Sequence, residues 1–392
     1  MTPAARAGAA IEILDEVVAA ARGGGAAADT IVSRYFSTRR YAGSKDRRAV
    51  RELVYRAIRG WAEAPPSGRA ALLGLGDAEV AALFDGSAHA PAPLGEAEVL
   101  AAPAHVVPGW LQPRLDPLLG AEEGPALLQR APLDLRVNRL RGTREEALAM
   151  LPEAIATPLS PLGLRLPDGT RVEETEASRT GLVEVQDEGS QLLALACAAA
   201  PDMVVVDLCA GAGGKTLALA AEMGNRGRLV ASDTDRGRLS RMRPRLERAG
   251  VSIVEPRLLD PGRELAALAE LAGAADVVLV DAPCSGTGTW RRNPELRWRL
   301  TPDRLARFVK TQAYLIDLGW KLVRPGGVLV YAVCSLLAEE GRGQAEAFAG
   351  RSSAVSENAP IPGGRAAGPG RLLTPGHDGT DGFFVARWRR PC

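Results

Sequence analysis

The regular alternation of apolar, strand-like runs with helical segments from residue 204 onward is the feature that most limits how this chain can fold. The runs VVVDLC, GRLVASD, SIVEPRLLD, ADVVLVD and VLVYAVC are rich in β-branched residues, and helical sequences separate them. The stretch VVLV has no polar interruption, as expected of a strand covered on both faces. This order predicts a doubly wound, mostly parallel sheet, so we expect a Rossmann-like α/β domain over residues 186–392.

The preceding half of the chain has a different pattern. Apolar residues recur at helical spacing from Ala9 to Arg22 and from Asp46 to Ala62, which predicts a helical domain over residues 1–130. Residues 131–185 contain the short β-like pieces LRVNRL, LRLPDG and VEVQ around one helix, and we expect a small α+β module there. Hydrophobic residues make up 46% of the chain and charged residues 24%, which excludes disorder as the main state.

Charge is unevenly distributed along a chain whose formal net charge is only +1. Residues 34–59 contain nine basic and two acidic side chains, with aromatic residues between them. Such a cluster suits a polyanion, and it predicts contact with nucleic acid. The alternative is a solvated helix face whose aromatic residues lie in a core.

No apolar run reaches the roughly 18–20 residues that cross a bilayer. The first twenty residues carry Glu12, Asp15 and Glu16 within their apolar stretch, which is not typical of a secretory signal. Five unevenly spaced cysteines do not indicate a disulfide framework. We therefore expect a cytoplasmic protein with no membrane association, and we take it to be a monomer.

A cofactor site is predicted at the ends of the first three strands. The glycine-rich turn after VVVDLC brings backbone N–H groups and a helix N-terminus close to a ligand, but it matches neither GxGxxG nor the P-loop pattern. Asp233 and Asp260 close the next two strands, where acids meet ribose hydroxyls and an adenine edge. Each acid alone is more often a helix cap. Together these features favour S-adenosylmethionine (SAM).

Two cysteines follow the last two strands of the expected sheet. Cys284 lies in DAPCSGTG and Cys334 in YAVCS, and adjacent strands are about 5 Å apart, so both thiols can face one pocket. Cytosine C5 is too weak a nucleophile to take a methyl group directly. A thiolate that adds to C6 makes C5 enamine-like, which allows methylation and then elimination of the thiol. Paired thiols beside a methyl donor therefore indicate cytosine C5 methylation.

The motifs QDEGSQ, DLCAGAGGKT, DAPCSGTG…RRNPELRW and YAVCS, in this order, resemble those of the RsmB/Nol/Nop/Sun family of RNA (cytosine-5) methyltransferases. The resemblance covers roughly residues 131–390. Residues 1–130 are more weakly similar to the NusB-like RNA-binding domain of the bacterial rRNA members. The resemblance implies a SAM-dependent enzyme whose substrate is RNA, above all small-subunit (16S) rRNA.

The resemblance also implies roles for individual residues. Cys334 matches the nucleophile, and Cys284 matches the cysteine that assists product release. DNA methyltransferases carry their nucleophile at the position of Cys284, which leaves the reverse assignment open; we favour Cys334 because those enzymes lack a matching second cysteine. Asp281 matches an acid near SAM and the cytosine N3 edge. The SAM-binding set is completed by Cys209, Ala210, Gly211, Ala212, Gly213, Gly214, Lys215, Asp233 and Asp260.

Two positions depart from the family pattern. Ala212 replaces a proline of the SAM loop, and we expect binding to survive with a looser turn. Val333 replaces a threonine beside Cys334, which alters the local hydrogen bonding.

Lysine and arginine side chains supply the remaining expectations. Lys215 is predicted to lie beside a thiolate, where a cation lowers a thiol pKa; the alternative is a solvent-exposed lysine in the first turn of a helix. The arginines of TWRRNPELRWR, with Trp290 and Trp298, form a loop suited to phosphates and to stacking a splayed-out base, although core packing explains the tryptophans equally well.

The three histidines have no metal-ligand spacing, so no metal site is predicted. Cys197 and Cys209 read as small buried hydrophobes.

Three rival functions remain from the sequence alone. A tRNA cytosine methyltransferase differs only in substrate. An RNA-binding ribosome assembly factor with a vestigial methyltransferase domain is disfavoured by the intact motifs. An amino-group methyltransferase requires an [DNS]PP[YFW] motif where this chain has DAPC.

Overall fold

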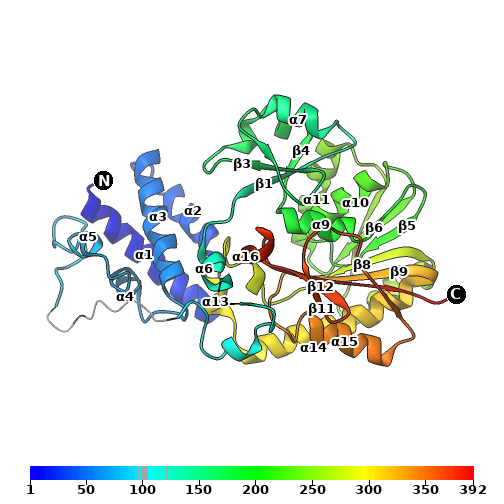
Figure 1. The fold of residues 1–392 in the computed structure, drawn as a ribbon. Helices are drawn as coiled ribbons and strands as arrows, with labels where there is room; N and C mark the ends of the chain where they lie inside the picture. Colours follow the sequence, from blue (N-terminus) through cyan, green and yellow to red (C-terminus); the bar gives the residue numbers. More distant parts are fainter. Residues whose placement is uncertain (96–97, 99–104, 121) are drawn as a thin grey trace. The chain divides into compact units, whose positions relative to one another are not determined.

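Helices build the N-terminal part of the chain, as the sequence predicts (Figure 1). The first begins after the cap residue Thr2, whose hydroxyl accepts a hydrogen bond from Ala5 N, and it ends at Gly24 in the left-handed conformation. Its apolar face packs with those of the next two long helices around Ile13, Val54 and their neighbours. The helices are α1 (Pro3–Gly23), α2 (Ala28–Ser37), α3 (Ser44–Gly60), α4 (Gly68–Leu73) and α5 (Ala78–Ala81).

The structure is a computed structural model that describes residues 1–95, 98, 105–120 and 122–392. The described chain divides into two units. One unit comprises Met1–Leu115, Gly124–Gln129 and Thr289–Pro302, and the other Asp116–Glu123, Arg130–Gly288 and Asp303–Cys392. The predicted domain boundaries at residues 130 and 185 stay predictions.

The first of these units, which contains α1 to α5, is called the helical unit below. The segment Thr289–Pro302 belongs to it. Arg297 is 2% exposed, and its guanidinium donates to the backbone carbonyls of Ile58 (2.7 Å) and Val106 (2.8 Å). Trp298 is part of the helical core, and its indole N–H donates to Trp61 O at 3.0 Å. The phosphate-binding interpretation of this loop is therefore wrong for Arg297, and core packing is the correct alternative for Trp298. The sequence could not distinguish them, because arginine and tryptophan serve in either setting.

We expect Arg297→Met to lower the free energy of unfolding of the helical unit by about 3 kcal/mol, because several buried carbonyls lose their donor. Thermal and urea denaturation followed by circular dichroism measure the change. Arg48→Met is the matched control: Arg48 is exposed on α3, so its replacement should change stability by less than about 0.5 kcal/mol. Unchanged stability with weakened RNA binding in Arg297→Met would restore the phosphate-binding interpretation.

The second unit contains the predicted doubly wound sheet. Its strands run in the order β11-β12-β13-β9-β8-β5-β6-β7, with β10 paired to β13. Strands β7, β6, β5, β8 and β9 are parallel, and β13 joins β9 antiparallel. The bounds are β5 (Val204–Asp207), β6 (Arg228–Asp233), β7 (Val254–Leu258), β8 (Ala275–Asp281), β9 (Val323–Val333), β10 (Val355–Glu357), β11 (Arg365–Ala367), β12 (Gly370–Leu373) and β13 (Phe383–Arg389).

Helices cover both faces of this sheet, with α9, α10 and α11 on one side and α14 and α15 on the other (Figure 1). The covered strands have unbroken apolar cores, as in Val277–Val280. The main helices are α9 (Glu188–Leu195), α10 (Gly214–Glu222), α11 (Arg236–Ala249), α14 (Pro302–Leu322) and α15 (Arg342–Arg351). The shorter helices of the described chain, in both units, are α6 (Glu123–Leu128), α7 (Arg144–Met150), α8 (Glu176–Arg179), α12 (Glu264–Ala267), α13 (Leu296–Arg299) and α16 (Pro375–Asp378). Within the described ranges, no helix has the combined length and apolarity that a bilayer crossing requires.

A second, smaller sheet lies in the same unit and has the order β2-β3-β1-β4. It has its own apolar core around Leu135, Val137 and Leu164. Helix α7 begins with a capping box formed by Thr143 and Glu146. This sheet forms where the sequence predicts an α+β module. Its strands are β1 (Leu133–Val137), β2 (Ile155–Ala156), β3 (Gly163–Leu166) and β4 (Val183–Val185).

Two elements are irregular. The segment RPGG lies inside β9, where the register with β8 shifts between Ala275 and Val277 and Gly326 takes a φ of 73°. The segment ELAALAELAG forms the short α12 followed by a 3-10 turn at Ala269–Leu271. The turn keeps Leu268 and Leu271 both buried.

Candidate active site

The predicted site residues converge because β5, β6, β8 and β9 are parallel and end at one edge of the sheet. The glycine-rich loop follows β5, Asp233 ends β6 and Asp281 ends β8. Cys284 follows β8, and Cys334 comes directly after β9. This edge is where open α/β sheets place their ligands.

The glycine-rich loop has the tight backbone that its sequence predicts. Gly211 and Gly213 have φ values of 56° and 85°, a region that favours glycine. A Cβ on Gly213 would lie 2.7 Å from Cγ of Met242, so no larger residue fits without a shift. Helix α10 begins directly afterwards, and its N-terminus faces this edge of the sheet.

Asp233 stabilises this loop. One carboxylate oxygen accepts from Gly211 N at 2.8 Å, and the other accepts from Asp235 N at 2.8 Å. The carboxylate therefore holds the loop after β5 and the start of the segment after β6 at fixed positions. Asp260, by contrast, is exposed, two residues beyond the end of β7.

Arg245 stabilises the glycine-rich loop at Ala212, the residue that replaces the proline of the family pattern. Its guanidinium donates to Ala212 O at 2.6 Å and forms an ion pair with Glu184 at 3.0 Å. Arg245 lies on α11, so sequence spacing gave no signal for this contact. The backbone at Ala212 is thus fixed by a hydrogen bond to its carbonyl.

Lys215 forms a short ion pair in the site. Its Nζ lies 2.7 Å from Oδ2 of Asp281, and its side chain is 12% exposed. Burial alone favours the neutral amine, but the negative charges of Asp281, Cys334 and Asp207 and the hydrogen bond to Asp281 outweigh it and raise the pKa of Lys215. Lys215 is therefore a buried ammonium, and the alternative of a solvent-exposed lysine is wrong.

The two cysteines meet, as the strand spacing predicts. Their Sγ atoms are 3.3 Å apart, within range of an S–H···S contact. The hydrogen bond to Cys334, burial, and the charges of Cys334 and Glu340 raise the pKa of Cys284 well above its ordinary value. Cys284 therefore stays a thiol at neutral pH.

The other cysteines differ in their surroundings. Cys197 is 1% exposed in the core beneath the sheet, and burial raises the pKa of its thiol. Cys209 lies in the loop after β5, and burial there also raises the pKa of its thiol well above the ordinary value. Cys197 is the small buried hydrophobe that the sequence predicts.

Sequence reasoning missed Asp207, the last residue of β5. It is 1% exposed, and its Oδ2 accepts from Thr216 Oγ1 at 2.7 Å. Its Oδ1 is buried and has no hydrogen-bond partner among the described residues. Burial, partly offset by Thr216, raises the pKa of Asp207 to about 7. A strand-end acid directly before a glycine-rich turn is the signal that could have singled it out.

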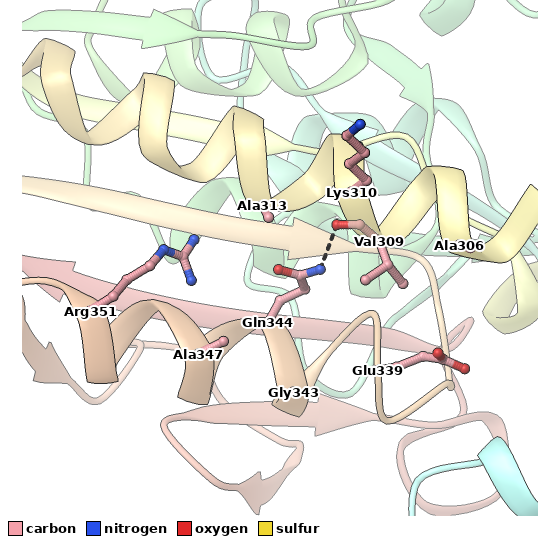
Figure 2. Close-up of a pocket in the computed structure, with 9 residues that line it drawn as sticks. All are labelled: Ala306, Val309, Lys310, Ala313, Glu339, Gly343, Gln344, Ala347 and Arg351. Carbon is pink, nitrogen blue, oxygen red and sulfur yellow. Dashed lines mark hydrogen bonds between the residues drawn. The ribbon is translucent and has the colours of Figure 1, made fainter.

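A cavity of about 580 Å³ lies elsewhere in the same unit, between α14 and α15 (Figure 2). Gln344 crosses it, and its Nε2 donates to Val309 O at 2.7 Å. Lys310 and Arg351 lie along its walls. None of the predicted site residues lines this cavity, so the cavity is distinct from the site around Cys284 and Cys334.

The sequence of this chain is similar to those of known proteins. A sequence model of the family described as 16S rRNA methyltransferase RsmB/F matches residues 194–389. Ribosomal RNA small subunit methyltransferase B of Sodalis glossinidius is 35% identical over 295 residues, which are 72% of this chain and 65% of the relative. The Salmonella typhi protein of the same name is 36% identical over 291 residues, 71% of this chain and 65% of the relative. The chain thus spans about 65% of the length of these relatives.

Among solved structures, the protein PH0851 superposes with a TM-score of 0.76 over 100% of both chains at 23% identity. At this identity the likeness concerns the fold. NSun6 from Pyrococcus horikoshii, solved with SFG, gives a TM-score of 0.62 at 23% identity over 69% of this chain and 93% of its own. The Rossmann-like fold predicted from the strand–helix rhythm is confirmed.

Proposed function

Because this chain belongs to the RsmB/F family of 16S rRNA methyltransferases, we propose that it transfers a methyl group from SAM to C5 of a cytosine in small-subunit rRNA. The predicted family and the predicted cofactor, SAM, are both confirmed. The observation that carries the cytosine C5 assignment is the contact between two thiols, 3.3 Å apart, beside a buried lysine. Methylation of an oxygen or an amino nitrogen has no use for paired thiols, whereas C5 methylation does.

The loop after β5 fits SAM. Gly211, in the left-handed conformation, has open space where a side chain would stand, and the buried Oδ1 of Asp207 at the end of β5 is an acceptor without a hydrogen-bond partner among the described residues. In this proposal the loop from Cys209 to Lys215 holds the cofactor, Asp233 accepts from its ribose hydroxyls, and Asp260 lies toward its adenine edge. SAM supplies the electrophilic methyl group that C5 accepts.

The chain's own residues perform the remaining steps. Cys334, as thiolate, adds to C6, and Lys215 stabilises the anion before attack. Asp281 is fixed by Lys215 at 2.7 Å, so its other oxygen remains to orient the cytosine N3 edge. After methylation a base removes the C5 proton, and the C6–S bond breaks to return the Cys334 thiolate. Cys284, which keeps its proton, donates a hydrogen bond that stabilises the departing Cys334 thiolate.

The helical unit offers a surface for RNA. Arg40, Lys45, Arg48 and Arg51 are exposed between the end of α2 and the middle of α3, and Tyr41 among them is 73% exposed. Cations beside an exposed aromatic ring suit phosphates and an unstacked base. This surface supports an RNA substrate.

Release of tritium from RNA labelled at cytosine C5 tests the proposed reaction. Small-subunit rRNA incubated with the protein and SAM should lose one tritium for each methyl group incorporated, because the C5 proton leaves only in this chemistry. Methyl incorporation without tritium release would rule out the C5 assignment. A tRNA mixture in a parallel reaction tests the substrate, and faster tritium release from tRNA would overturn the rRNA assignment.

A further inference from the structure

A buried carboxylate lies beneath the two cysteine loops. Glu340 follows β9 in the segment before α15, and it is 0% exposed. A carboxylate removed from water is stable only when well-placed donors surround it. The origin of those donors therefore shows what the residue holds together.

One group of donors comes from the loop that carries Cys284. Ser285 N donates to Oε1 of Glu340 at 2.9 Å, and the Ser285 hydroxyl donates to Oε2. Gln312 of α14 donates from Nε2 both to Oε1 of Glu340 at 2.9 Å and to Pro283 O at 3.0 Å. Cys284 thus lies between two residues that are tied, directly or through Gln312, to the same carboxylate.

The other donor comes from the loop that carries Cys334. The Ser335 hydroxyl donates to Oε2 of Glu340 at 2.6 Å and accepts from Leu337 N at 3.1 Å. The hydroxyls of Ser285 and Ser335 are 3.2 Å apart. The serine that follows each cysteine therefore donates a hydrogen bond from its hydroxyl to the same atom, Oε2 of Glu340.

We propose that Glu340 is a positioning residue that holds the Cys284 and Cys334 loops together, so that the two sulfurs stay in contact. This assignment rests on the proposed function for its effect on the reaction, but the sulfur contact itself can be measured without RNA. Glu340 acts on the reacting sulfurs through Ser285, through Ser335 and through the contact of Gln312 with Pro283 O. Its negative charge also contributes to the raised pKa of Cys284, after the hydrogen bond to Cys334, burial and the charge of Cys334.

Variants at Glu340 separate positioning from a general loss of folding. We expect Glu340→Ala to lower kcat by about 10²-fold, the cost of misplacing a reacting group by about 1 Å, with KM for RNA and SAM affinity within about twofold of wild type. Glu340→Gln keeps the shape of the side chain, and the serine hydroxyls can rotate to accept from its amide. It should therefore recover part of the lost kcat, and it remains informative if Glu340→Ala fails to fold.

Glu123→Gln is the matched control. Glu123 is a 2% exposed carboxylate of the same unit, and it accepts from Gly376 N at 2.8 Å and pairs with Arg365. Its replacement should lower the melting temperature and leave kcat per folded molecule unchanged. If Glu340 has a merely structural role, Glu340→Gln should likewise lower the melting temperature and leave kcat per folded molecule unchanged.

Phenylarsine oxide measures the sulfur contact independently of methylation. One arsenical condenses with two neighbouring thiols, forming two As–S bonds and releasing one water. Wild type should bind one arsenical through Cys284 and Cys334, with Cys284→Ser as the negative control, and Glu340→Ala should bind it at least about tenfold more slowly. Wild-type kcat in Glu340→Ala, or arsenical capture at the wild-type rate, would overturn the assignment. If wild type captures the arsenical but methylates no cytosine, the proposed function fails and the arsenical arm still decides the role of Glu340.

Discussion

Replacing Cys334 by alanine is expected to abolish methylation, whereas replacing Cys284 by alanine is expected to trap RNA on the protein. Loss of the nucleophile should lower kcat by at least about 10⁴-fold, on the scale reported for other nucleophilic enzymes. Loss of Cys284 leaves C6 attack possible but removes the thiol that donates to the Cys334 sulfur as it leaves. A covalent protein–RNA complex that survives a denaturing gel should therefore accumulate only in Cys284→Ala.

The raised pKa of Cys284 gives this prediction its direction. The hydrogen bond between the two sulfurs is the largest cause of the shift, so Cys284 keeps its proton at neutral pH. In the proposed mechanism Cys334 is the sulfur that attacks C6. The opposite gel pattern, an adduct in Cys334→Ala and none in Cys284→Ala, would transfer the nucleophilic role to Cys284. Cys197→Ala, in a buried cysteine of the core, is the matched control and should behave as wild type.

Replacing Lys215 by methionine is expected to lower kcat by about 10²- to 10³-fold, the cost of removing one fixed charge from a site that stabilises an anion. Cys334 contributes to the raised pKa of Lys215, so the ammonium and the sulfur lie within electrostatic range of each other. Without the ammonium, the thiolate faces the carboxylate of Asp281 uncompensated. A higher pH is then needed to form the thiolate, so the acid limb of the rate profile should move to higher pH.

The pH dependence of kcat and of adduct formation in the Cys284→Ala background measures this shift. Lys310→Met is the control, because Lys310 is an exposed lysine of α14 and should leave the profile unchanged. A loss of SAM affinity with an unshifted acid limb would assign Lys215 to cofactor binding alone.

Local sequence patterns determined the catalytic fold and the place of its site. Apolar runs separated by helices allow few arrangements other than a doubly wound sheet, and parallel strands end at a common edge. The residues that follow those strands, Asp233, Asp281, Cys284 and Cys334, therefore had to gather there whatever the details of packing. The 3.3 Å contact between the two sulfurs agrees with that expectation.

Side chains with two plausible environments were beyond the reach of local pattern. An arginine in a basic loop can bind phosphate or satisfy buried carbonyls, and Arg297 does the second because the carbonyls of Ile58 and Val106 are close to it. Arg245 likewise replaces the stiffening effect of a missing proline from a different helix. Neither contact has a signature in sequence spacing.

The sequence by itself determined which chemical groups stand at the sheet edge, because strand order and period fix where each strand ends. Only the tertiary structure decided the protonation and the fixed positions of those groups. These depend on neighbours far away in the chain: Asp281 for Lys215, and Glu340 with Gln312 for the loops of Cys284 and Cys334. Charge interactions and burial act through distance in space, and that distance is set when the helices and strands pack.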